Sequence, residues 1–269
     1  LMKRLVMYHL KFSLLLLLFI SSCKTPSMLV TREQQEGDNY ANNSEYKQAV
    51  FHYNNSLTAS KELGTYRNFD TEAGICRKLA YVYSNLGQYD SALNIISEAI
   101  ILDSSSNNQL ALISNYRIKG NIFLFKGDYY HGIPMLEKTL VMISGLENSI
   151  KSLNQKTVAD TYQSLAEANL SLGRYSISRN YATRAYSIYE SLKNENGKME
   201  SLLVLANISK NLGDAGSAIR RLNLSLEIAE NEEHNTSRHH QALGEAYSLL
   251  GKHEQALREK LIALDQAKK

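Results

Sequence analysis

The stretch LAYVYSNLGQYDSALNIISEAI, residues 79–100, decides the fold of this chain. Large apolar or aromatic side chains lie on both sides of Gly87, namely Leu79 and Tyr83 before it and Tyr89 and Ile96 after it. Glycine takes the left-handed backbone conformation that ends a helix more easily than other residues do. The stretch therefore predicts a helix, a tight turn at Gly87 and a second helix.

The same pattern occurs six times along the chain. The turn residues are Ser44, Gly87, Gly127, Gly173, Gly213 and Gly251, about 38 to 46 residues apart. This period is typical of arrays of helical hairpins. Only 2 prolines and 14 glycines occur in 269 residues, which fits long helices joined by short turns. We therefore predict about six repeats and about twelve helices.

Small residues occur at three fixed offsets from the turn. Five residues after it stand Ala49, Ala92, Gly132, Ser178, Ala218 and Ala256. Seven further on stand Ser56, Ala99, Thr139, Ala185, Ser225 and Ala263. Seven before the turn stand Gly37, Ala80, Gly120, Ala166, Ala206 and Gly244. A large side chain would overpack a close helix contact, so these columns predict where helices approach one another.

These repeats resemble the tetratricopeptide repeat (TPR) family, most strongly at residues 79–100 and 241–257. The resemblance implies an all-α, right-handed superhelical solenoid rather than a generic array of hairpins. The chain departs from the family pattern because it lacks the usual Trp and closing Pro and has a longer period. We place the repeats at about 31–62, 70–104, 110–145, 156–192, 198–231 and 236–269, within one continuous solenoid over 31–269.

The first 23 residues form an export signal. Lys3, Arg4 and Lys11 precede an apolar run that ends at Ile20 and is too short to span a bilayer. The segment from Ile20 to Cys23 resembles a bacterial lipobox, which implies lipid attachment at Cys23; an ordinary secretory signal is the alternative. We expect a signal peptide over 1–22 and a tether over 23–30, and Lys24 favours the outer over the inner membrane. Leu1 is an unusual start, so either end of the sequence can be incomplete.

The charge and the motifs argue against other classes of protein. Without Lys3, Arg4 and Lys11, the chain has 27 basic and 27 acidic residues. It therefore lacks the surplus of basic residues that is typical of nucleic-acid-binding proteins. The motifs HExxH, CxxC and GxSxG are absent from the sequence. We expect Cys76 to be a buried core thiol, and His239 and His240 to divide between core and surface instead of binding a metal. We expect no cofactor, no metal, no small-molecule substrate and no enzymatic activity.

The TPR resemblance also implies a binding groove, because the first helix of each repeat lines the inner face of a TPR superhelix. The implied groove residues are Arg77, Tyr81, Arg117, Asn121, Gln163, Glu167, Asn207, Lys210, Gln241 and Glu245. We favour the first four, since Arg and Tyr are enriched at interface hot spots. Arg117 and Asn121 resemble half of the basic-residue-plus-Asn pair that TPR chaperone adaptors use for a peptide carboxylate. The matching half two repeats later is absent.

We therefore expect a lipid-anchored scaffold of the bacterial cell envelope that binds a partner protein or peptide in its groove. The alternative is the extracytoplasmic sensor region of a longer signalling protein, such as a histidine kinase or a transcription regulator. The sequence beyond Lys269 would separate the two: kinase or DNA-binding motifs would favour the sensor, and a stop codon the scaffold.

Overall fold

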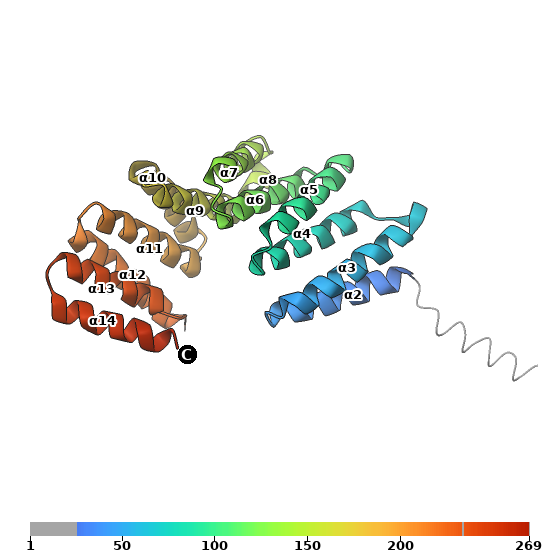
Figure 1. Ribbon diagram of the computed structural model, residues 1–269. Helices are drawn as coiled ribbons and strands as arrows, with labels where there is room; N and C mark the ends of the chain where they lie inside the picture. The colour runs from blue at the N-terminus through green and yellow to red at the C-terminus, as the bar shows by residue number, and fades with distance from the viewer. Residues whose placement is uncertain (1–25, 233, 269) are drawn as a thin grey trace, which may run out of the picture. The chain divides into compact units, whose positions relative to one another are not determined.

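A computed structural model describes residues 26–232 and 234–268 of the chain (Figure 1). These residues form thirteen α-helices, a short 3₁₀ helix at Gly64–Tyr66 and no β-strand. The predicted signal segment and Cys23 lie outside the described residues. The helices are α2 (Pro26–Asn42), α3 (Tyr46–Glu62), α4 (Phe69–Asn85), α5 (Tyr89–Ser105), α6 (Gln109–Phe125), α7 (Tyr129–Ser144), α8 (Asn148–Leu153), α9 (Gln155–Ser171), α10 (Tyr175–Ser191), α11 (Glu195–Asn211), α12 (Ala215–Asn231), α13 (Ser237–Leu249) and α14 (His253–Gln266).

The helices belong to two compact units, one ending at Lys126 and one beginning at Gly127. In the first unit, each helix from α2 to α6 packs on the next along the chain, and α4 also packs on α6. In the second unit, each helix from α9 to α14 packs on the next, and α9, α11 and α13 also contact one another in that order. Each unit is thus a stack of hairpins in which first helices lie beside first helices, which confirms the predicted all-α repeat fold.

The six predicted turn residues all have the left-handed backbone conformation. The five glycines have φ between 68° and 82°, and Ser44 has φ of 61°. Serine takes this conformation at a steric cost that glycine does not have. The turn is therefore retained at Ser44 because the helices on both sides of it are packed.

All members of the three columns of small residues are buried. Three serines of these columns also donate a hydrogen bond from Oγ to a main-chain oxygen of the neighbouring helix. These bonds run from Ser56 to Val30, from Ser178 to Ala166 and from Ser225 to Met199, with lengths of 2.7 to 2.8 Å. A larger residue would separate the two backbones, so the columns mark close helix contacts, as predicted.

Two segments differ from the prediction. Residues 26–30, which we expected to belong to a tether, form the start of α2, because Val30 is buried against α3 and its carbonyl accepts the bond from Ser56. The short helix α8 lies between the expected third and fourth repeats.

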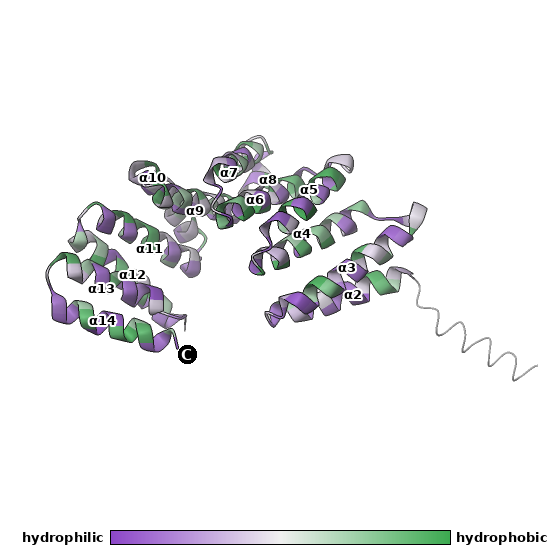
Figure 2. Ribbon diagram, viewed as in Figure 1, coloured by the Kyte–Doolittle hydropathy of each residue, from purple (hydrophilic) through white to green (hydrophobic). Residues whose placement is uncertain are grey.

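Polar and apolar residues alternate along the helices (Figure 2). This amphipathic pattern is the one expected of helices that bury one side and expose the other. No helix in the described part of the chain is both long enough and apolar enough to cross a membrane.

Candidate functional site

The first helices α4 and α6 line a pocket with a volume of about 640 Å³ in the first unit. Three of the favoured groove residues, Tyr81, Arg117 and Asn121, lie in its wall. The other lining residues are Ser84, Asn85, Tyr89, Ile118, Ile122 and Phe125. The structure thus brings together residues that are 40 positions apart in the sequence, because α4 and α6 hold equivalent places in successive repeats.

Two residues that line this pocket each have a buried polar atom that makes no hydrogen bond within the described protein: Nε of Arg117 and Oδ1 of Asn121. Leaving a buried donor or acceptor unpaired costs free energy, about 1–3 kcal/mol for each group. Arg117 is also the one charged residue among the residues that line the pocket. The pocket wall therefore carries a positively charged side chain and an amide, four residues apart on one helix face, and each has a polar atom that no protein group satisfies.

Aromatic side chains form much of the remaining wall. Tyr81 is exposed and makes an edge-to-face contact with Tyr46, with ring centroids 6.4 Å apart. Partial burial raises the pKa of Tyr81, and the neighbouring Tyr46 adds to this shift, so the phenol stays neutral near pH 7. The sequence analysis did not select Phe125 and Tyr89 for the site, although both stand beside the turns whose positions it predicted.

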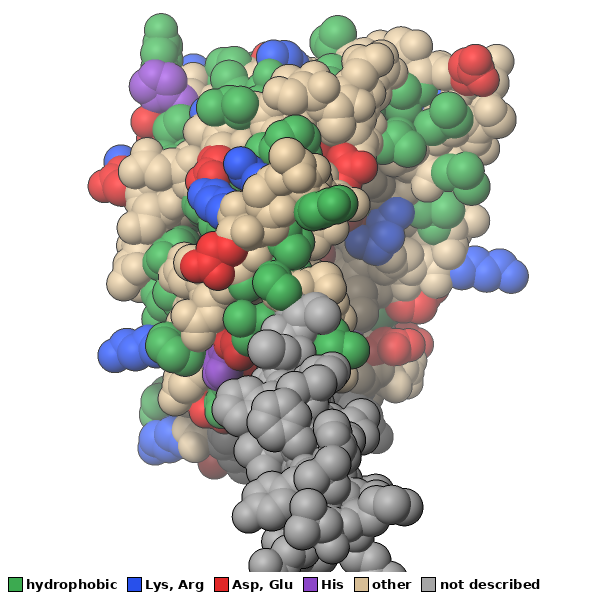
Figure 3. All heavy atoms as spheres, turned by 90° about the vertical axis from the view of Figure 1, so that its right-hand side faces the viewer, with side chains coloured by type: hydrophobic (Ala, Val, Ile, Leu, Met, Phe, Trp, Pro, Cys, Tyr) green, Lys and Arg blue, Asp and Glu red, His purple; other side chains and the backbone are tan. Residues whose placement is uncertain are grey.

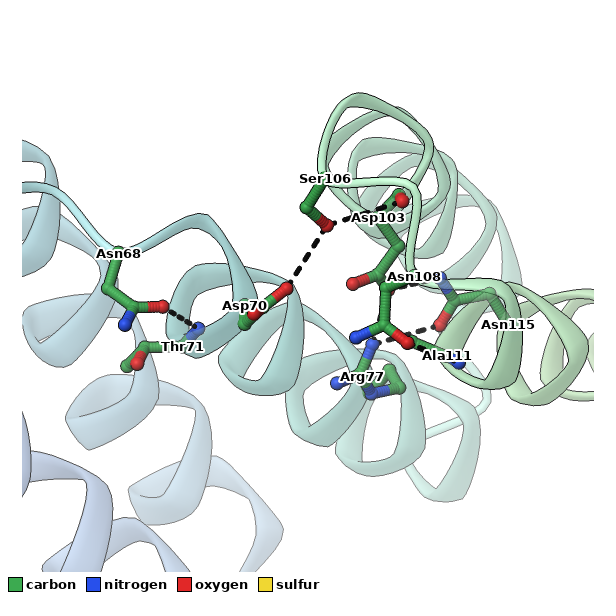
Figure 4. Close-up of polar contacts among 9 residues, drawn as sticks. All are labelled: Asn68, Asp70, Thr71, Arg77, Asp103, Ser106, Asn108, Ala111 and Asn115. Carbon is green, nitrogen blue, oxygen red and sulfur yellow. Dashed lines mark hydrogen bonds and ion pairs between the residues drawn. The ribbon is translucent and has the colours of Figure 1, made fainter. Parts of the chain in front are cut away.

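Arg77 has a different environment from Arg117. Its Nη1 donates to Oδ2 of Asp103 at 2.6 Å and to Oδ1 of Asn115 at 3.3 Å, as Figure 4 shows. Asn115 completes the triangle by donating to the same Oδ2 at 2.7 Å. Asp103 is fully buried, so this network holds a buried negative charge between α4, α5 and α6.

Arg77 therefore has a structural role that the sequence analysis did not predict. It also lines a second pocket of about 480 Å³ with Lys78, Tyr53 and Tyr81, but Lys78 is itself paired with Asp38. Charge reversal at Arg77 would place a second carboxylate against the buried Asp103 and would therefore destabilise the first unit. Arg117 is for this reason the better residue for a binding test.

In the second unit, most of the predicted groove residues of α9, α11 and α13 bond to one another. Gln163 accepts from Ser201 and donates to Glu167, each at 2.8 Å. Lys210 pairs with Glu245, which also accepts from Gln241 at 3.3 Å. Asn207, the remaining predicted groove residue, lies half-buried on α11. The polar side chains of this face thus form hydrogen bonds and an ion pair with one another, whereas Arg117 and Asn121 in the first unit each keep an unpartnered atom.

Glu167 has an altered acidity. Its side chain reaches solvent, but the surrounding protein removes part of the hydration of its carboxylate, and the like charge of Glu200 adds to the effect. Both raise the pKa of Glu167, against a smaller lowering by the bond from Gln163. Glu167 therefore holds a proton more tightly than an ordinary exposed glutamate does.

The residues considered for other chemistry are structural. Cys76 is fully buried, and burial raises the pKa of its thiol to about 12, so it is inert as expected. His239 and His240 are both buried, so the predicted division between core and surface was wrong. His239 bonds to Ser225 of α12 and His240 to Glu259 of α14, because adjacent helical residues face different neighbours. Among the described residues, no three potential metal ligands cluster.

Comparisons with known proteins agree with this fold. The family model described as Tetratricopeptide repeat matches residues 73–106, which lie in α4, α5 and the turn between them. No curated protein matches the chain. The apo form of the quorum sensor NprR from B. thuringiensis is similar, with a TM-score of 0.68 and 14% identity over 98% of this chain and 84% of NprR.

Two further solved structures are similar at the level of the fold. Rap protein complexed with Competence and Sporulation Factor has a TM-score of 0.68 and 17% identity, over 93% of this chain and 71% of Rap. BtubC (BKLC) from P. vanneervenii has a TM-score of 0.64 and 15% identity, over 91% of this chain and 92% of BtubC. The chain is thus an all-α helical-repeat protein that carries a tetratricopeptide repeat.

Proposed function

We propose that this protein is a non-enzymatic scaffold that binds a segment of a partner protein through the pocket between α4 and α6. The observation that carries the proposal is that Arg117 and Asn121, each with a buried polar atom lacking a partner, both line a pocket with aromatic walls. A polypeptide supplies complementary groups, because an acidic side chain or main-chain carbonyl accepts from the guanidinium and a main-chain N–H donates to the amide oxygen.

The neighbouring structures support this proposal. Rap was solved in complex with Competence and Sporulation Factor, and NprR is described as a quorum sensor. Both share the helical-repeat fold with this chain, although fold alone does not imply a shared partner. The aromatic and apolar residues around Arg117 would add buried contact area to the polar contacts, as at protein interfaces.

Charge reversal at Arg117 is expected to abolish partner binding. Removing an arginine hot spot costs about 2 kcal/mol or more, which corresponds to roughly 30-fold in affinity, and a glutamate adds repulsion against an acidic partner. We would place a photo-crosslinking amino acid at Phe125, inside the pocket, and identify the products in envelope fractions by mass spectrometry. The product should be lost in the Arg117→Glu variant.

Two matched controls define the result. Arg179→Glu changes an exposed arginine on the second helix α10 and should keep the product. The same photo-crosslinker at Ile101, which is 66% exposed against 65% for Phe125, should give none. Equal crosslinking with and without Arg117→Glu would remove the pocket from the binding site.

We further propose that the protein is exported and anchored by lipid at Cys23, with the outer membrane as its location. The support is the order of the N-terminal sequence: basic residues, an apolar run, Ser21, Ser22 and then Cys23. Two or more acyl chains are enough for stable membrane anchoring. Anchoring would keep the scaffold at the membrane surface, where it could gather envelope proteins.

Replacing Cys23 with serine is expected to release the protein from the membrane fraction, because the thiol that carries the lipid is lost. Fractionation and labelling with a fatty-acid analogue measure this directly. Cys76→Ser is the matched control and should leave the labelling unchanged, because Cys76 is buried in the core. Fatty-acid labelling that persists in the Cys23→Ser protein would end the lipoprotein proposal.

A further inference from the structure

The pocket between α4 and α6 is chemically different at its two ends. Arg117, Asn121 and Phe125 follow one another at intervals of four residues on α6, so they lie on one side of this helix. At a rise of 1.5 Å per residue, Arg117 and Phe125 are about 12 Å apart along the helix axis. Arg117 places a positive charge at one end of the pocket, and Phe125, which is 65% exposed, places a large apolar surface at the other.

The charge of Arg117 is not neutralised within the first unit. Arg77 and Lys78 of the neighbouring helix α4 each pair with a carboxylate, whereas Arg117 forms no ion pair in the described part of the chain. None of the described residues that line the pocket is acidic. An arginine stays charged and can bind both oxygens of a carboxylate through parallel N–H groups. This end of the pocket therefore favours an acidic group of a ligand.

The end at Phe125 favours an apolar group. Ile122, which is almost fully buried, and Tyr89 of α5 line the pocket together with Phe125. A side chain that covers the exposed ring of Phe125 would remove apolar surface from water, which is favourable. On the side of the molecule where α2 and α3 lie, Figure 3 shows charged and apolar side chains intermixed. In the pocket, the charge and the exposed apolar ring are instead kept apart along α6.

The distance between the two ends indicates the conformation of the ligand. An extended chain advances about 3.3 Å per residue, and every second side chain points to the same side. Side chains four positions apart therefore lie on one side of the chain and about 13 Å apart, which matches the separation of Arg117 and Phe125. In a helix the same distance takes about eight residues, and the main-chain groups between them are already bonded to one another. Only an extended segment leaves such groups free for the amide of Asn121.

A bound segment does not have to end beside Arg117. Tyr81 lines this pocket and also the second pocket, to which α2 contributes Asp38, Ala41 and Asn42. The two pockets thus adjoin at Tyr81, so a chain that lies beside Arg117 can continue towards α2. This continuity favours the carboxylate of an internal side chain over the carboxylate of a chain terminus.

We propose that the pocket recognises an extended internal segment in which an acidic side chain and a large apolar side chain stand four positions apart. The acidic side chain pairs with Arg117, the apolar side chain covers Phe125, and the main chain between them passes Asn121. This inference rests on the proposed function, because it specifies the chemistry of the segment that the same pocket binds.

Synthetic peptides test the spacing with the full-length chain in mild detergent. Each peptide is acetylated and amidated and carries one glutamate and one phenylalanine, two to eight positions apart and in either order, among glycines and serines. Fluorescence anisotropy should give the tightest binding at a spacing of four in one of the two orders. Changing the glutamate to glutamine or the phenylalanine to alanine should weaken binding by about tenfold or more. No binding, no preferred spacing or an optimum at seven or eight would overturn the inference.

Two variants of the protein assign the two ends of the pocket. Arg117→Gln should remove the preference for glutamate over glutamine and keep the preference for phenylalanine, and Phe125→Ala should do the reverse. Ile101→Ala is the matched control, because Ile101 is 66% exposed on α5 and does not line the pocket, so both preferences should persist. Loss of both preferences in the Ile101→Ala variant, or of neither in the other two, would contradict the assignment.

The crosslinking experiment at Phe125 separates this inference from the proposed function. If the crosslinked product depends on Arg117 while the peptides show no preferred spacing, the pocket binds its partner through other chemistry and only the inference fails. If the product survives Arg117→Glu, the proposed function fails, whatever the peptides do.

Discussion

Replacing Arg77 with alanine is expected to lower the free energy of unfolding by about 3–5 kcal/mol, because it leaves a buried carboxylate without its cation. Asp103 is fully buried, and its Oδ1 already lacks a hydrogen-bond partner. Without Arg77, its Oδ2 would keep only the bond from Asn115. Thermal and urea unfolding followed by circular dichroism would show the loss as a lower transition midpoint for the first unit.

Two variants separate the lost ion pair from a general effect of truncating an arginine. Arg117→Ala, at the equivalent position of the next repeat, breaks no ion pair of the described chain and should change stability by only about 0.5 kcal/mol. Asp103→Asn in the Arg77→Ala background removes the unpaired charge at nearly the same volume and should restore much of the loss. If the Arg77→Ala variant and the wild type unfold at the same midpoint, the ion pair between Arg77 and Asp103 does not stabilise the protein.

Replacing Gly37 with alanine is expected to destabilise the first hairpin by about 1–3 kcal/mol through overpacking, although alanine favours helix. A Cβ at Gly37 would lie 2.5 Å from Cε1 of Tyr53, far inside van der Waals contact. Tyr53 cannot move away easily, because its ring is buried and its hydroxyl donates to Asp38 at 2.7 Å. The same unfolding measurements report the change.

Gly74 provides the matched control for this prediction. It lies in α4 of the same unit, and a Cβ there would meet its nearest atom, Nη2 of Arg77, at an ordinary 3.7 Å. Gly74→Ala should therefore stabilise the protein by up to about 1 kcal/mol through helix propensity. A second variant, Tyr53→Leu combined with Gly37→Ala, should recover part of the loss. If Gly37→Ala and Gly74→Ala changed the free energy of unfolding in the same direction, the close contact between position 37 and Tyr53 would not determine stability.

The sequence predicted the fold because its decisive features are local. A tight turn between helices needs a residue that accepts the left-handed conformation, and glycine supplies it at five of the six turns. Close helix contacts need small residues, and these recur in the sequence at fixed offsets from each turn residue. The position of α8 and the burial of both His239 and His240 depend on longer-range packing and could not be predicted from these local features.

The candidate site shows most clearly which features the sequence determines and which depend on tertiary contacts. Arg77 and Arg117 occupy the same repeat position, ten residues before Gly87 and Gly127, so the sequence assigned both to the groove. Sixteen residues after the turn, however, one repeat has Asp103 and the next has Ile143. Arg77 finds the carboxylate of Asp103, 26 positions away, and becomes part of the structure, whereas Arg117 has no acid at the equivalent position. Periodicity determined where the two arginines stand, but only the tertiary contacts decided which of them keeps a charge available for a partner, because an ion pair depends on what lies across the helix interface.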